Sequence, residues 1–359
     1  MGLAAIVVVE TGTADSYPAA PADTKTKQKA KAGVGEPLPC VEIMGRSMLE
    51  RTIERFVHAN VEVVTVLMSG DAAWAAQSTR NAHDRVKFKS VCDIGSAIGK
   101  EIREFSQSGI DHAFIVSANV YTETDLFDFY SFHRESQQRA TKAIDRDGRL
   151  GFGIVDCGKA LEIDIENILM RGEGAGSSYF VREYVSQLNH TRDLRRTITD
   201  ALNGRCAMRP AGTEVKPGVW VDEGAQVHKR ARIVAPAYIG RGSRIRQDTV
   251  ITRCSSIEKD CYVDWGTVIE DSSILSDTHI GISVDVCHAI ANGNKLLNLE
   301  RDVVIEISDP GVMRSTSPVR KQPRSTIHPE EERVIVADLQ EQKLSTPEPW
   351  QLGTNPIQG

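Results

Sequence analysis

The amino-acid sequence predicts a two-part α/β protein, in which a domain with a mainly parallel sheet is followed by a β-helix of hexapeptide repeats. An aliphatic residue recurs at every sixth position between Val221 and Leu275, ten times without a break. The position four residues after each one holds a small side chain in nine of the ten cases. Short apolar runs alternate with amphipathic segments over roughly the first 200 residues, which is typical of a parallel sheet with crossover helices.

The repeat predicts the second part in detail. Each hexapeptide supplies one short strand on one of three faces, so roughly 18 residues complete a turn. The aliphatic residue then points into the shaft, and the small residue fits at the corner. The aliphatic positions are Val221, Val227, Ile233, Ile239, Ile245, Ile251, Ile257, Val263, Ile269 and Leu275. The frame slips beyond Leu275, where Val284–Ile290, Lys295–Leu299 and Val303–Ile307 are expected to form closing strands.

The first part is predicted to run strand, helix, strand, helix, strand, helix. Ser47 with Glu50 three residues later is a helix-capping pattern, and Asp93 and Asp125 are candidate caps of two further helices. Apolar residues at helical spacing follow each cap. The predicted strands are Leu3–Val9, Val61–Met68 and His112–Ser117.

The domain boundaries follow from weaker signals. Residues 140–212 interleave apolar and charged side chains without clear caps, which predicts an irregular remainder of the first domain, with a turn at Asp145–Gly148. Two prolines and two glycines lie between Gly204 and Pro217 and mark a boundary. We therefore expect domains at 1–210 and 211–308, and a mostly disordered tail at 309–359 with one apolar island at Val334–Leu339.

Composition narrows the classes of function. The net charge of -6 argues against a nucleic-acid partner, and the apolar run near the start is too short to span a membrane. Seven scattered cysteines without a close pair favour reduced thiols in a cytoplasmic protein over a disulfide framework. Small-molecule or protein partners are expected instead.

Three stretches resemble the sugar-1-phosphate nucleotidyltransferases, in particular mannose-1-phosphate guanylyltransferase-like proteins. They are EPLPCVEIMGRSMLERTIERF from Glu36, DHAFIVSANVYTETDL from Asp111, and GVWVDEGAQVHKRARIVAPAYIGRGSRI from Gly218. With the overall layout, the resemblance covers about three quarters of the chain. It implies a Rossmann-like nucleotidyltransferase domain and a left-handed β-helix. The implied reaction joins a sugar-1-phosphate to a nucleoside triphosphate and releases pyrophosphate, which depends on positioning and charge neutralisation.

The resemblance also implies where nucleotide-binding residues would lie. Thr11, Gly12 and Thr13 match the loop that follows the first strand and cradles phosphates, but Ala14 stands where the family has arginine. Glu10 adds an anion beside that path.

The other two charged positions of the family are also changed. Glu36 stands where the family has lysine, and Asn119 where an aspartate holds magnesium. A contact charge pair is worth roughly 4 kcal/mol at an effective dielectric near 20, and reversing one sign turns attraction into repulsion. Asn119 is neutral and a poor sole ligand, so no metal site is expected here, and Mg²⁺ is implied only if the protein is active.

The sequence therefore favours a catalytically impaired member of the family that regulates or scaffolds nucleotide-sugar or polysaccharide synthesis, and forms homo- or hetero-oligomers through the β-helix. Such a protein could still bind a nucleotide or nucleotide sugar. One alternative is an active guanylyl- or uridylyltransferase with relocated ligands. A second is a hexapeptide acyltransferase, whose general base would be His228, His279 or His288.

Overall fold

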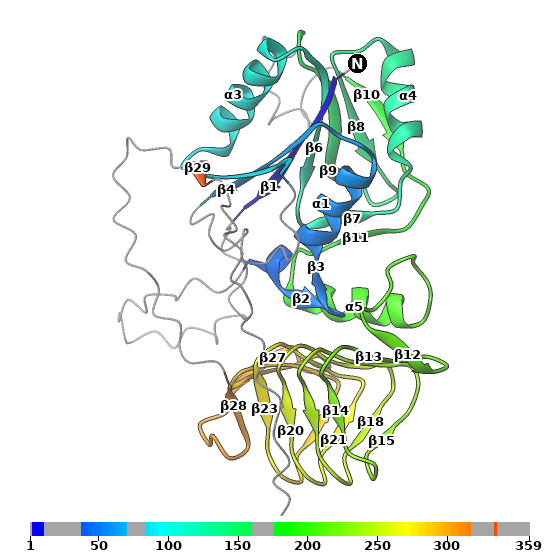
Figure 1. The fold of residues 1–359 in the computed structure, drawn as a ribbon, viewed down its shortest axis with the longest axis vertical. Helices are drawn as coiled ribbons and strands as arrows, with labels where there is room; N and C mark the ends of the chain where they lie inside the picture. The colour runs from blue at the N-terminus through cyan, green and yellow to red at the C-terminus, as the bar shows by residue number, and fades with distance from the viewer. Residues whose placement is uncertain (1, 11–36, 70–83, 160–175, 317–333, 336–359) are drawn as a thin grey trace, which may run out of the picture.

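The computed structural model describes residues 2–10, 37–69, 84–159, 176–316 and 334–335. The fold is mixed α/β, with parallel and mixed sheets and few helices. Figure 1 shows the main sheet with its helices at the top and a coil of short strands at the bottom, with β2, β3 and α5 between them. Among the described helices, none has both the length and the apolar character needed to cross a bilayer.

The upper part is built on one mixed sheet of eight strands, in the order β10-β8-β9-β6-β1-β4-β5-β29. Four neighbouring strands in its centre are parallel: β5, β4, β1 and β6. The elements of this part are β1 (Gly2–Val9), β2 (Glu42–Ile43), β3 (Arg46–Ser47), α1 (Met48–His58), β4 (Val63–Ser69), β5 (Val86–Val91), α3 (Ile94–Gln107), β6 (Ile110–Ser117), β7 (Val120–Thr122), α4 (Leu126–Ser136), β8 (Ala140–Ile144), β9 (Arg149–Asp156), β10 (Ser177–Phe180), β11 (Val185–Gln187), α5 (Thr191–Leu202) and β29 (Val334–Ile335).

Both faces of this sheet are buried. Apolar residues of α1 and α4, such as Phe56 and Phe129, pack on one face of the sheet, and Ile98 and Ile102 of α3 pack on the other. The strands β1 and β4 are consequently almost continuously apolar, as expected for parallel strands covered on both sides.

The three predicted helix starts are confirmed. The Ser47 hydroxyl accepts a hydrogen bond from the Glu50 amide at 3.0 Å, and Asp93 accepts one from Ser96 at 3.0 Å. Asp125 accepts one from the Phe127 amide at 2.7 Å. Each side chain satisfies a backbone donor that lacks a partner within the helix, which fixes where the helix begins.

The prediction of an irregular segment is wrong for the described residues 140–159 and 176–212, but the predicted turn at Asp145–Gly148 is confirmed. β8 and β9 form a hairpin whose turn is held by Asp145, since its side chain accepts bonds from the amides of Asp147 and Gly148, both at 2.9 Å. The helix α5 also lies in this segment. Its apolar face consists of little more than Leu194, Ile198 and Ala201, which is too sparse to stand out among charged neighbours. The strand β5 was missed because lysines alternate with its apolar residues.

The lower part, which we call the coil, contains three sheets whose strands follow one another in rotation along the chain, and these strands are parallel except at the two ends of the coil. In the first turns of the coil, each strand pairs with the strand that lies eighteen residues further along the chain, as Ala237 pairs with Ser255. The strands are β12 (Thr213–Lys216), β13 (Val219–Val221), β14 (Gln226–Val227), β15 (Arg232–Ile233), β16 (Ala237–Ile239), β17 (Arg244–Ile245), β18 (Val250–Thr252), β19 (Ser255–Ile257), β20 (Tyr262–Val263), β21 (Val268–Glu270), β22 (Ser273–Ile274), β23 (Thr278–Ile280), β24 (Asp285–Cys287), β25 (Ala289–Asn292), β26 (Lys295–Asn298), β27 (Val303–Glu306) and β28 (Met313–Ser315).

The last aliphatic position of the predicted repeat is wrong by one residue. Ile257 pairs with Ile274, seventeen residues on, so Ile274 rather than Leu275 takes the inward slot. Leu275 packs on the outside of the same sheet with Ile290 and Leu297. The spacing shortens from eighteen to seventeen residues at the corner formed by Asp271, which has a positive φ of 44°.

Small residues at the corners are explained by hydrogen bonding as well as by space. The Ser243 hydroxyl donates to the Glu258 carbonyl at 2.6 Å and accepts from the Cys261 amide at 3.0 Å. Both residues lie in the next turn of the coil. Ser272 repeats the pattern with Val286 and Ala289. The inward hydroxyls therefore bind backbone carbonyls and amides at the corners, which do not all find partners in the strand ladders.

The far end of the coil is closed by antiparallel strands. β25, β26 and β27 pair in succession, and β28 pairs with β23 through Ile280 and Met313. β28 lies beyond residue 308, so ordered structure continues into the segment that the sequence assigns to the tail.

Candidate functional site

The strand order creates a switch point between β1 and β6. The chain moves outward from β1 to β4 and β5, then returns through α3 to place β6 on the other side of β1. In open parallel sheets, ligands bind outside the carboxyl ends of the two strands at such a point. Val8 of β1 lies opposite Ser117 of β6, so the residues that follow both strands meet at this edge.

Glu10 and Asn119 are the residues at this edge. Glu10 is exposed directly after β1, and Asn119 is half-buried in the turn after β6. The backbone of Asn119 is held in place, since its carbonyl accepts a hydrogen bond from the Leu188 amide at 2.8 Å. A carboxylate side chain and a neutral amide therefore stand at the carboxyl ends of β1 and β6.

The other predicted nucleotide-binding residues, Thr11, Gly12, Thr13 and Glu36, lie outside the described residues, as does Ala14. Asn119 is the one predicted nucleotide-binding residue that the structure describes, and it lies in the turn after β6.

Two arginines of α1 lie near this region but bind backbone. Arg55 donates to the Thr122 carbonyl at 2.5 Å, and Arg51 donates to the Ile43 carbonyl at 3.1 Å. Burial lowers the pKa of both guanidinium groups, although arginine remains charged. Both line a cavity with Tyr121 that has about 20 Å³ of free space, room for about one water molecule. These cations therefore support the fold around α1.

A tight hairpin joins the start of α1 to the coil. β2 and β3 are connected through Met44 and Gly45, with φ values of 50° and 85°, the geometry of a two-residue turn with left-handed central residues. The Met44 amide donates to Glu258 Oε1 at 3.0 Å, and the Gly45 amide lies 3.4 Å from Oε2. The hairpin tip is thereby fixed to β19 and the residue that follows it.

Glu258 is completely buried in this joint. Burial raises its pKa to about 7, against the opposing effect of the Met44 and Gly45 amides, the Ser256 side chain and Arg51. No sequence signal identifies this residue, because Glu258 directly follows an inward aliphatic residue and the two backbone amides that bind it lie more than 200 positions away.

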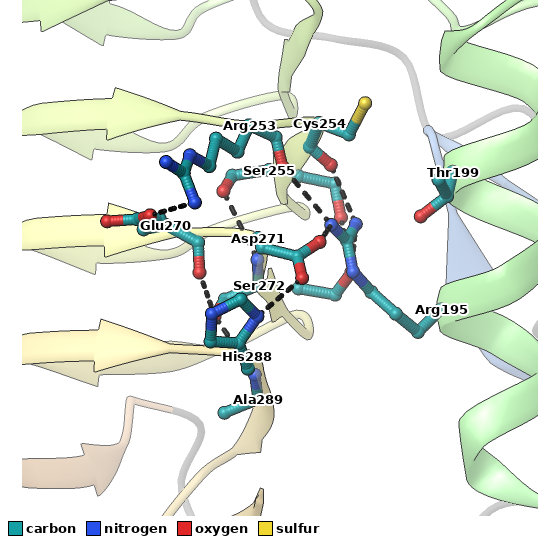
Figure 2. A network of polar contacts seen from close by, with 12 residues as sticks. Arg195, Thr199, Arg253, Cys254, Ser255, Glu270, Asp271, Ser272, His288 and Ala289 are labelled. Atoms are coloured by element: carbon teal, nitrogen blue, oxygen red, sulfur yellow. Dashed lines mark hydrogen bonds and ion pairs between the residues drawn. The ribbon is translucent and has the colours of Figure 1, made fainter. Parts of the chain in front are cut away.

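A second joint connects α5 to one corner of the coil (Figure 2). Arg195 donates to the Cys254 carbonyl at 2.6 Å, the Arg253 carbonyl at 3.3 Å and Asp271 Oδ1 at 2.5 Å. Asp271 Oδ2 in turn lies 2.6 Å from His288 Nδ1. Burial by itself would raise the pKa of Asp271, but the hydrogen bonds from Arg195 and His288 hold it below its ordinary value.

The structure does not bring the three candidate histidines together. His228 follows β14 at the start of the coil, whereas His279 lies in β23 and is nearly buried. His288 has a carboxylate on Nδ1, the arrangement that orients a general base, but the same carboxylate neutralises Arg195. We interpret this network as a set of structural hydrogen bonds that holds α5 against the coil.

Removal of the Arg195 hydrogen bonds should lower the stability of the protein. Arg195→Ala removes the donor to two carbonyls and to Asp271 Oδ1, and we expect a loss of about 2 kcal/mol in the free energy of unfolding. The expected loss is below the range for fully buried pairs because Asp271 is partly exposed. Urea denaturation measures the effect, with Arg196→Ala on the exposed side of α5 as the control. Equal stability of the two variants would contradict the interpretation.

Comparison with models of known protein families gives no match, and no curated protein is significantly similar to the chain in sequence. We therefore infer function from the residues and their geometry.

Proposed function

We propose that this chain is a catalytically impaired protein of the sugar-1-phosphate nucleotidyltransferase type, which regulates or scaffolds nucleotide-sugar or polysaccharide synthesis. The observation that supports this proposal most is the pair Glu10 and Asn119 at the carboxyl ends of β1 and β6. Phosphoryl transfer requires cations and a carboxylate-held metal at such a place. A negative charge and a neutral amide instead disfavour the triphosphate and its metal.

The coil supports an assembly role in the same proposal. We interpret its three sheets and eighteen-residue register as a left-handed hexapeptide β-helix, in which the inward slots are filled by buried aliphatic residues such as Ile239, Ile251 and Ile269. The coil is also fixed to the α/β part at two joints, through Glu258 and Arg195. A rigid shaft of this kind can present its outer faces to a second subunit.

The direct test is a pyrophosphate-release assay with the four nucleoside triphosphates, a panel of sugar-1-phosphates and Mg²⁺. We expect no release above the level without protein. Release that is abolished by Asn119→Ala would overturn the proposal and favour an active transferase. Thermal-shift measurements with nucleotides and nucleotide sugars report binding separately, since stabilisation grows with ligand excess over its dissociation constant.

Restoring the charges should restore affinity for nucleotide. In the triple variant Ala14→Arg, Glu36→Lys and Asn119→Asp, we expect at least a tenfold gain in affinity for a nucleoside triphosphate with Mg²⁺, or about 1.4 kcal/mol. Isothermal titration calorimetry measures the gain. The matched control is Glu223→Lys on the exposed surface of the coil, which makes a similar change in net charge away from the site. An unchanged affinity in the triple variant argues against a degenerate nucleotide site.

A further inference from the structure

The outer edge of the main sheet is covered by residues from the far end of the chain. β29 pairs antiparallel with β5, with Val334 opposite Lys89 and Ile335 opposite Phe88. Figure 1 shows β29 in orange at this edge of the sheet, below α3. The other side of β5 is occupied by β4. Without β29, β5 would present a row of backbone donors and acceptors, which invites pairing with any other strand.

We propose that the edge of β5 is a docking site for an added β-strand, and that its occupant is the segment of this chain's own C-terminal tail that contains Val334 and Ile335. This inference does not depend on the proposed function. The two residues are β-branched and belong to a short aliphatic run in an otherwise polar tail sequence. β-Branched residues are favoured in strands, and main-chain pairing supplies most of the affinity in strand addition.

Charge selects this occupant over a second β5 edge. β5 carries Lys87, which is exposed, and Lys89, which is ion-paired with Glu101 and Glu104 of α3. Two such edges would bring lysines together, and lysine on an edge strand is a common protection against that pairing. Val334 and Ile335 carry no charge, so their pairing with β5 brings no second lysine to this edge.

The connection is long enough for docking within one chain. Thr316 is the last described residue of the coil, and the eighteen steps to Val334 span at most about 60 Å when extended. A tethered segment experiences an effective concentration in the millimolar range, which a free second copy reaches only at very high protein concentration. Docking within the chain is therefore favoured over exchange between chains.

Hydrogen exchange of the full-length protein tests this docking. In the double variant Val334→Asp, Ile335→Asp, we expect the β5 amides that face β29 to exchange at least tenfold faster than in the unchanged protein. The control is Ile327→Asp, which places a charge elsewhere in the tail and should leave β5 protected. A synthetic peptide of residues 328–342, added at millimolar concentration, should restore the protection in the double variant.

Two results would overturn the proposal. One is equal β5 exchange in the double variant and the unchanged protein, which would mean that the tail does not cover this edge. The other is protection that disappears on dilution together with a dimer seen by sedimentation, which would assign the covering strand to a second copy. Protection that is independent of protein concentration supports docking within the chain.

Discussion

Replacing Glu258 with glutamine is expected to remove a pH dependence of stability that this one buried carboxyl imposes. Burial raises the Glu258 pKa from 4.5 to about 7, so the folded protein holds this proton more tightly than the unfolded chain does. The stabilisation from the protonated form is complete below about pH 4.5 and is lost as the pH rises to about 7. The corresponding change in the free energy of unfolding is about 3 kcal/mol.

Glutamine cannot ionise, so its free energy of unfolding should lack this decline. It keeps one acceptor oxygen for the Met44 amide and loses the second acceptor at Gly45, which costs about 1 kcal/mol at every pH. We therefore expect the variant to be slightly less stable than the unchanged protein at pH 5 and more stable at pH 8.

Urea denaturation at several values between pH 5 and 8 measures this crossover. The control is Glu223→Gln, an exposed glutamate of the same coil, which should follow the unchanged protein at every pH. A stability difference between the Glu258 variant and the unchanged protein that stays constant with pH would show that Glu258 is not protonated near neutrality.

Periodic, local features of this fold could be read from the sequence. The inward aliphatic slots of the coil follow from a repeat that each turn enforces on the next. The helix caps at Ser47, Asp93 and Asp125 depend only on neighbouring residues. The position of Asn119 at the carboxyl edge follows from the strand that precedes it.

Features that depend on distant partners could not be read in this way. The turn that contains the Asp271 corner is one residue shorter than the turns before it. Ile274 and Leu275 are both aliphatic, so the sequence alone does not show which of them points inward, and the pairing of Ile274 with Ile257 decides it. Glu258 and Arg195 are polar residues whose burial results from contacts between the two parts of the chain. Their partners are mostly backbone groups, which leave no pattern in the sequence.

The hairpin tip at Gly45 predicts a second large effect, from Gly45→Ala. A Cβ at this position would lie 2.5 Å from Ala211 Cβ and 2.6 Å from the Tyr238 hydroxyl oxygen, at a φ of 85°. Tyr238 is fully buried, and the Ala211 amide donates to the Met44 carbonyl at 3.0 Å, so the added methyl group would have to displace atoms that are already held in place. Overpacking costs about 1–3 kcal/mol and the left-handed backbone about 1–2 kcal/mol.

We therefore expect Gly45→Ala to lower the free energy of unfolding by about 2–5 kcal/mol. The matched control is Gly204→Ala, where φ is 69° and no heavy atom lies within 4 Å of the added Cβ, so only the backbone term applies. Denaturation of both variants separates the two contributions, and hydrogen exchange at the Met44 amide reports whether the hairpin tip leaves Glu258. Equal losses in the two variants would mean that the tip is not packed against the coil, because the backbone term alone would then account for both.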